Sequence, residues 1–245
     1  TKGNKEKEKK KEKEKEKGKE KNAKKVPKID PNLAILTGRV VLKGTPPEIE
    51  ELKVPDGHRD RAACAAHVRS EVLILGKSQQ LKNVVVAIDE KFRPKKTPPP
   101  RVVQFDNRNC LFVPHVLATV VGSTLELKNS DPFIHNSRGL LNPIGHINTA
   151  IPPKGVVKKT LRKPGWGVMK CDFHPWMTAH LHVFRHELFD VTDAAGTYKI
   201  VNIPPGTYTF YFWHERVAFK KTARKATLEA GKTTRLDVEI EAPTS

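Results

Sequence analysis

The chain has 245 residues, 37% of them hydrophobic, and carries a formal net charge of +18. This length suits one large or two small globular domains. No uninterrupted apolar run approaches the roughly 18 residues that a transmembrane helix needs, so we expect no membrane span. The 19 prolines and 15 glycines, together with many Val, Thr and Ile runs, indicate short strands and turns rather than long helices.

The positive charge is divided between two parts of the sequence. Residues 1–28 contain 14 Lys and 6 Glu, a net +8, and the remaining +10 belongs to residues 29–245. Because Lys alternates with Glu in this tail, and no Arg-rich helix or base-stacking aromatic pattern accompanies it, we expect no nucleic-acid binding. The charge of the body favours an acidic protein partner or a negatively charged surface. The tail lacks core-forming residues, so we expect it to be disordered.

Short segments rich in β-branched residues follow one another from Ile29 onward. Their spacing predicts an all-β sandwich fold. Residues 58–70 are the only plausible short helix, and the Gly/Pro/Asn-rich residues 136–155 are expected to form a long loop. The predicted strands are 37–44, 72–75, 83–89, 102–105, 110–113, 118–121, 124–128, 156–161, 167–171, 180–184, 222–228 and 233–240, with turn-and-strand units at 193–200 and 201–213.

Three potential metal ligands lie close together in residues 168–184. Cys171, His174 and Met177 are spaced Cys-x2-His-x2-Met between two predicted strands. A thiolate, an imidazole and a thioether suit copper, and a copper site for electron transfer adds a second imidazole. His135 can supply that imidazole from a distant strand. The thioether favours copper over zinc.

Each of these residues alone has an ordinary explanation. An isolated Cys or Met is usually a buried hydrophobic residue. Their grouping with a histidine in one loop, which Pro175 stiffens, favours a metal site instead. Asn136 would hydrogen-bond to the ligand loop and orient it, or would be an ordinary turn residue.

The sequence contains three cysteines, and Cys171 is assigned to the metal. A disulfide between Cys64 and Cys110 would leave none over and would indicate an oxidising compartment. The alternative is three free buried thiols in a cytosolic protein. Cysteine counting favours the disulfide.

Further histidines cluster after the ligand loop. His180 and His182 would share one face of a strand, and His186 follows them. They form either a second, weaker metal site or an exposed polar face. Strand periodicity favours the exposed face.

The stretch from Cys171 to Met177 resembles the copper-ligand loop of the cupredoxins, with the short spacing of amicyanin. Residues 121–136 resemble the strand, turn and first ligand of the same family, which includes plastocyanin. The resemblance covers about residues 101–184. It implies a Greek-key sandwich that holds one type 1 (blue) copper through His135, Cys171, His174 and Met177.

In that family the second histidine of the loop lies at the protein surface, among apolar residues, and passes the electron. His174 with Pro175 and Trp176 matches that position. The resemblance therefore implies an exposed apolar patch at these residues, where a redox partner would dock weakly. The alternative is that Trp176 packs inward and supports the ligand loop, because buried Trp is common.

The end of the chain resembles a different family. The pattern of Asp, Gly, Tyr, Ile and Pro in residues 193–208 is similar to the carboxypeptidase regulatory-like, or transthyretin-like, sandwich, which is a non-catalytic module. The strand that usually begins that module fits residues 38–40, far upstream. We therefore expect four parts: the tail 1–28, residues 29–100, a cupredoxin-like domain at 101–184, and a transthyretin-like segment at 185–245. Either the cupredoxin-like domain is inserted into the second sandwich, or residues 29–100 supply its own first strands.

The resemblances imply an extracytoplasmic electron carrier, for example in the periplasm, with an acidic redox protein as its partner. We do not expect an enzyme, because oxidase or nitrite-reductase chemistry needs a further copper with open coordination and only one full ligand set is evident. A copper-binding protein without redox activity, and a structural envelope module with a degenerate metal site, are the alternatives.

Overall fold

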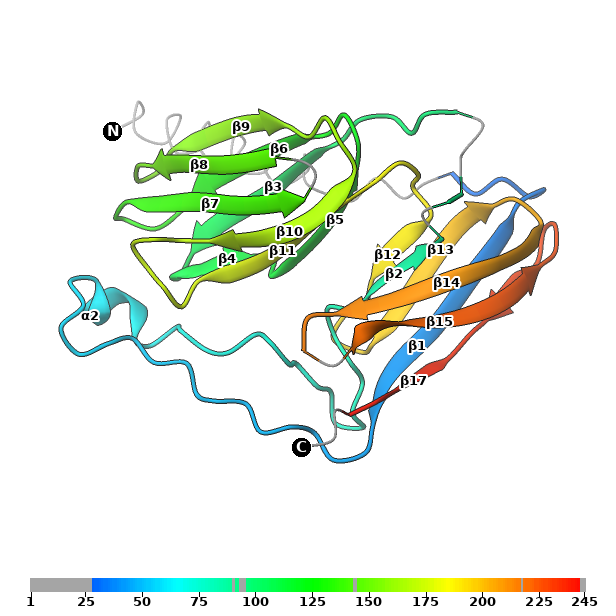
Figure 1. Ribbon diagram of the computed structural model, residues 1–245, viewed down its shortest axis with the longest axis horizontal. Coiled ribbons are helices and arrows are strands. Elements are labelled where there is room, and N and C mark those ends of the chain that lie inside the picture. Colours follow the sequence, from blue (N-terminus) through cyan, green and yellow to red (C-terminus); the bar gives the residue numbers. More distant parts are fainter. Residues whose placement is uncertain (1–27, 90, 93–95, 143–144, 217, 243–245) are drawn as a thin grey trace, which may run out of the picture. The chain divides into compact units, whose positions relative to one another are not determined.

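The computed structural model describes residues 28–89, 91–92, 96–142, 145–216 and 218–242, with only the backbone of 218–221. The predicted tail lies outside these residues except for Lys28. The chain divides into two units, Thr1–Asp30 and Pro31–Ser245, and the second contains all of the described secondary structure. Nearly all of that structure is β-strand, as the sequence predicts (Figure 1). Within the described residues, the structure contains no helix that could span a membrane.

The first pair of sheets contains the strands between residues 102 and 184. One sheet has the order β4-β3-β6-β9 and the other has the order β5-β11-β10-β7-β8. The strands are β3 (Val102–Arg108), β4 (Leu111–Val113), β5 (Val116–Val120), β6 (Thr124–Asn129), β7 (His135–Asn142), β8 (Gly145–Ile151), β9 (Val156–Thr160), β10 (Gly165–Lys170) and β11 (Thr178–Phe184).

Alternating side chains of these strands build one apolar core. In β6, Leu125, Leu127 and Asn129 are buried while their neighbours are partly exposed, which is the period of a strand with one face on the core. Burial of these side chains is the main force holding the sheets together. The same core contains Cys171 and Met177, so the ligand loop is anchored in it.

The second pair of sheets joins the two ends of the described chain. Its strands are β1 (Ala34–Lys43), β2 (Val85–Ile88), β12 (Phe189–Val191), β13 (Thr197–Ile203), β14 (Gly206–His214), β15 (Ala218–Leu228), β16 (Thr233–Arg235) and β17 (Val238–Glu241). β1 pairs with β13, β16 and β17, and β2 pairs with β12 and β14. Among the described strands, β1 and β2 therefore pair only with strands that follow residue 188. Side chains of these two sheets form an apolar core that is separate from the core of the first pair.

Residues 44–72, called the strap here, leave the second pair of sheets after β1. Val54 and Cys64 of this segment are buried in the core of the first pair. The strap contains the short helix α2 (Arg61–Cys64), drawn in cyan in Figure 1. The predicted helix 58–70 is thus wrong in length. Asp60 makes no side-chain capping bond to α2, because its carboxylate contacts Arg59 and His174 instead.

Two predictions about strands are also wrong. Residues 136–155 are not a long loop, because β7 and β8 pair through most of this stretch and β10 pairs with the other edge of β7. Gly139 permits this packing, since a Cβ at that position would lie 2.6 Å from the sulfur of Met169. Residues 72–75 form no strand, although Leu75 makes an isolated bridge to Leu81.

The approach of β1 to the chain after β16 depends on Gly38. A Cβ at this position would collide with the carbonyl oxygen of Leu236 and would lie 2.8 Å from the hydroxyl of Tyr198. We expect Gly38→Ala to lower the free energy of unfolding by about 1–3 kcal/mol, because the backbone must shift to relieve the overlap. Gly57→Ala is the matched control, since nothing lies within 4 Å of its Cβ. Chemical denaturation measures both, and equal stability of the two variants would contradict this packing.

Candidate metal centre

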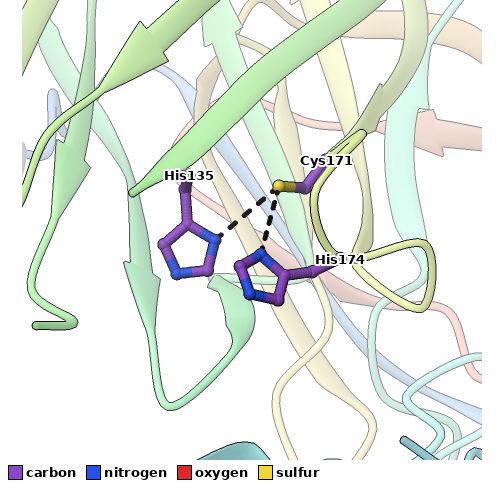
Figure 2. Close-up of side chains that lie close together, drawn as sticks. All are labelled: His135, Cys171 and His174. Carbon is purple, nitrogen blue, oxygen red and sulfur yellow. Dashed lines mark hydrogen bonds between the residues drawn. The ribbon is translucent and has the colours of Figure 1, made fainter. Parts of the chain in front are cut away.

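Two strands and one loop bring three ligand side chains together. His135 begins β7, Cys171 directly follows β10, and His174 lies in the loop between β10 and β11. β7 and β10 are paired neighbours, which places His135 beside the loop. The sulfur of Cys171 lies 3.7 Å from Nδ1 of His135 and 3.5 Å from Nδ1 of His174 (Figure 2). All three side chains are buried.

These separations fit a metal ion bound by all three residues. Bonds of about 2.0 Å to nitrogen and about 2.3 Å to sulfur, meeting at about 110–120°, separate the two ligand atoms by about 3.5–3.7 Å. His135, Cys171 and His174 form one such group in the described part of the chain. The donor set and its spacing therefore suit a thiolate-binding transition metal without rearrangement.

The outer nitrogen of each imidazole donates to a carboxylate. Nε2 of His135 lies 2.9 Å from Oδ2 of Asp131, and Nε2 of His174 lies 3.0 Å from Oδ2 of Asp60. When Nε2 carries the proton, Nδ1 keeps its lone pair for a metal. When the imidazoles are neutral, these carboxylates therefore favour the tautomer whose Nδ1 lone pair is free for a metal.

Asp131 is itself held in place by two backbone groups. The N–H groups of Asn109 and Cys110 donate to its carboxylate at 2.7 and 2.9 Å. Burial opposes ionisation of Asp131, but the bonds from His135 and from these two amides lower the pKa of its carboxyl group. An ionised Asp131 then orients His135.

Asn136 connects β7 to the ligand loop. Its backbone N–H donates to the sulfur of Cys171 at 3.4 Å. Its side chain accepts from the backbone N–H of Asp172 at 2.6 Å and donates to the Asp172 carboxylate at 2.7 Å. These bonds fix the start of the loop against the strand that carries His135.

Met177 closes the same loop. Its backbone N–H donates to the carbonyl oxygen of His174 at 2.9 Å, and its side chain is fully buried in the core that also contains Cys171. The structure therefore gathers His135, Cys171 and His174 into one group and places Met177 at the buried end of their loop.

The expected exposure of His174 and Trp176 is wrong. His174 is fully buried and Trp176 is only 8% exposed. The indole N–H of Trp176 donates to the carbonyl oxygen of Cys110 at 3.1 Å, so this side chain supports the loop from within. Asp172, Phe173 and Pro175 are the exposed residues of the loop.

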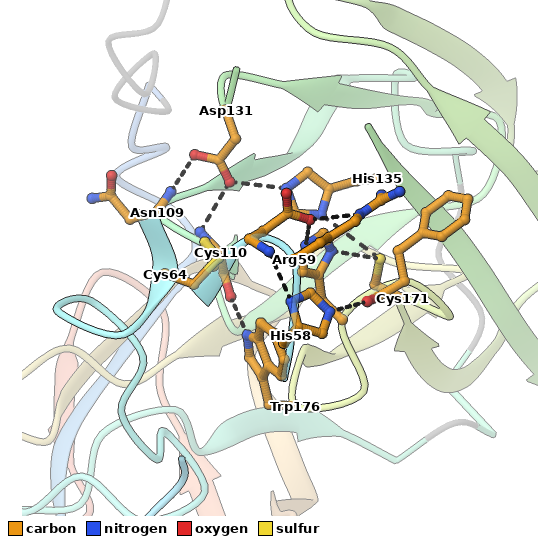
Figure 3. Close-up of a disulfide and its surroundings, with 12 residues drawn as sticks. His58, Arg59, Cys64, Asn109, Cys110, Asp131, His135, Cys171 and Trp176 are labelled. Carbon is orange, nitrogen blue, oxygen red and sulfur yellow. Dashed lines mark hydrogen bonds and ion pairs between the residues drawn. A yellow bond between two sulfur atoms is a disulfide. The ribbon is translucent and has the colours of Figure 1, made fainter. Parts of the chain in front are cut away.

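The strap covers this side of the loop (Figure 3). Besides the bond from His174 to Asp60, Nε2 of His58 lies 2.9 Å from the carbonyl oxygen of Phe173, and the His58 ring packs edge-on against Trp176 with 4.8 Å between centroids. A disulfide joins Cys64 of the strap to Cys110, whereas Cys171 is free. No local pattern in the sequence indicates these contacts from His58 and Asp60, because they depend on the tertiary path of the strap.

The histidines after the loop do not form an exposed face. His180 and His182 are both only 7% exposed. They lie on β11, an interior strand of its sheet, and the ring of Trp213 packs against both, with centroids 5.0 and 4.4 Å away. Periodicity placed these residues on one strand, but it could not show which side chains cover that strand.

No protein-family model and no curated protein matches this sequence. Among solved structures, the Cu-containing nitrite reductase from Thermus scotoductus SA-01 is 26% identical over 36% of this chain and 23% of its own length, with a TM-score of 0.33. A reduced mutant of amicyanin is 18% identical over 40% of this chain and 97% of its own, with a TM-score of 0.32. An amicyanin mutant in the Cu(I) state is 16% identical over 36% and 96%, also with a TM-score of 0.32. The chain thus spans about a quarter of the nitrite reductase.

The contacts around Cys171 predict an unusually acidic thiol in the metal-free protein. Burial raises its pKa, but His135, His174 and the Asn136 amide lower the value from 9.0 to about 6. We therefore expect the ultraviolet absorbance of the thiolate to persist at pH 7 and to disappear as the pH falls through about 6. Cys171→Ser, which removes the one free cysteine, is the control. A midpoint near 9 would show that the imidazoles do not stabilise the thiolate.

Proposed function

We propose that this protein binds one copper ion through His135, Cys171 and His174, with Met177 as a weak axial ligand, and carries single electrons. The observation that supports this most is the position of Cys171, with Nδ1 of an imidazole on either side at 3.5 and 3.7 Å. A thiolate with two imidazoles and a distant thioether is the ligand set of blue-copper electron-transfer sites.

The surrounding contacts suit a site in which the metal changes oxidation state while the ligand geometry stays the same. Asp60 and Asp131 fix the two imidazoles, and Asn136 fixes the loop. Copper, when bound, would supply the one-electron redox couple. The role of this chain is to keep the ligand geometry constant in both oxidation states, which lowers the reorganisation needed for each transfer.

A copper carrier without redox activity is the second candidate. Its support is the enclosure of the site, because both imidazoles are fully buried and the strap lies over His174. A measured reduction potential separates the two. Reversible one-electron reduction in the range of protein redox partners supports an electron carrier, whereas copper held in one oxidation state supports storage.

We also propose a cellular compartment, a class of redox partner and a docking surface for this protein. The disulfide between Cys64 and Cys110 favours an oxidising, extracytoplasmic compartment such as the periplasm. The net charge of +10 outside the tail favours an acidic redox protein as partner. Because Trp176 is buried, we place the docking surface at Phe173, which is 39% exposed, and at the adjacent Pro175.

Loading with Cu(II) should turn the protein intensely blue, because the Cys171 thiolate donates charge to the metal. We expect Cys171→Ser to lose this colour, since a hydroxyl cannot replace the thiolate. The visible absorption spectrum of the copper-loaded protein measures both. A variant that keeps the same band would show that Cys171 is not a ligand.

Met177→Leu should retain copper and shift the reduction potential upward. A thioether donates weakly to Cu(II), so its loss destabilises the oxidised state more than the reduced state. Voltammetry of the variant beside the parent protein gives the shift, and elemental analysis gives the copper content. Complete loss of copper from the variant would show that Met177 is needed to hold the metal, which would contradict a weak axial role.

A further inference from the structure

A second buried group of ligand-type side chains lies apart from the copper ligands. It consists of His115, His180 and Glu215, whose ligand atoms all lie within 4.8 Å of one another. His115 directly precedes β5, His180 lies on β11, and Glu215 directly follows β14. The group therefore joins a sheet of the first pair to a strand of the second pair.

Strand pairing and packing hold the three side chains in position. The backbone N–H of His180 donates to the carbonyl oxygen of His115 at 2.8 Å, so the parallel pairing of β5 and β11 sets the two imidazoles side by side. Their rings meet edge-on, with centroids 5.7 Å apart. Trp213, two residues before Glu215, packs against the ring of His180.

Both imidazoles direct Nε2 at the same carboxylate. Nε2 of His115 contacts Oε1 of Glu215, and Nε2 of His180 lies 2.9 Å from Oε2. His115 and His180 are 6% and 7% exposed, and the side chain of Glu215 is 10% exposed. Two imidazole nitrogens and a carboxylate thus converge on one enclosed point.

The carboxylates of Glu215 and Glu71 place negative charge beside His115 and His180, which favours a bound cation. The carboxylate of Glu215 is enclosed, and the imidazoles of His115 and His180 both contact it. A second carboxylate, Glu71 of the strap, lies 3.8 Å from Nδ1 of His115. Among the Lys and Arg residues whose side chains the structure describes, none forms an ion pair with either carboxylate. Buried negative charge of this kind is compensated by protonated imidazoles or by a bound cation.

We propose that His115, His180 and Glu215 bind a divalent zinc ion. Two imidazoles and one carboxylate are a known ligand set for zinc, and the absence of sulfur among them separates this group from the thiolate site at Cys171. Glu71 faces the other nitrogen of His115 and would orient that ring, which is the role of a carboxylate behind a metal-bound histidine. A zinc ion here would cross-link β5 and β11 to the end of β14.

Zinc content per chain tests the proposal directly. The full chain is dialysed against buffered micromolar free Zn²⁺, and bound zinc is measured by elemental mass spectrometry. We expect both Glu215→Gln and His180→Gln to bind one zinc fewer per chain than the parent protein. This difference does not depend on whether the Cys171 site also takes zinc, so it can fail or succeed independently of the proposed copper function. Equal zinc content in the parent protein and both variants would overturn the proposal.

Two further variants separate a metal site from a general structural effect. Glu71→Gln should keep the site but weaken zinc binding by about 10–100-fold, because it removes only an orienting carboxylate. His67→Gln replaces an exposed histidine of the strap and should leave zinc binding unchanged. Zinc should raise the melting temperature of the parent protein more than that of Glu215→Gln, because a ligand stabilises only the state that binds it.

A crystallographic measurement covers the case in which the ligand variants fail to fold. An anomalous difference map at the zinc edge, from crystals of the zinc-treated parent chain, should show a peak bonded to Nε2 of both His115 and His180. A map without that peak would mean that protonated imidazoles alone balance Glu215, and the proposal would be wrong.

Discussion

The contact between the Cys171 sulfur and two imidazole nitrogens is the constraint on which the rest of the site depends. Three segments must meet for it to form: the start of β7, the end of β10 and the loop that follows. Each imidazole is fixed from behind by a carboxylate, at Asp131 and at Asp60. Sheet pairing, backbone amides and the strap therefore together set the orientation of Nδ1 of His135 and Nδ1 of His174.

The strap both orients and buries His174. Asp60 reaches His174 from a segment that lies between β1 and β2 in the chain, and the bond from Cys64 to Cys110 ties that segment to the turn whose backbone also holds Asp131. Both imidazoles are thus oriented from one connected region. The same contacts bury His174, so the surface of the loop is formed by Asp172, Phe173 and Pro175 rather than by the imidazole.

The sequence predicts the grouping of His135, Cys171 and His174 better than it predicts the surroundings of that group. The close spacing of Cys171, His174 and Met177 is a local pattern, and an all-β fold follows from local composition. Asp60 lies 114 residues from His174 and carries no local signal, because its position depends on the tertiary path of the strap. The sequence does not predict β7 for a related reason: its Gly and Asn content suggests a loop, but pairing with β8 and β10 makes it a strand.

X-ray absorption at the copper edge of the copper-loaded full chain can show whether these three side chains bind copper, because it reports the atoms bound to the metal without relying on colour or activity. We expect one short copper–sulfur distance, from Cys171, together with two imidazole nitrogens, from His135 and His174. A first shell of nitrogen and oxygen only, without a short sulfur, would contradict this expectation.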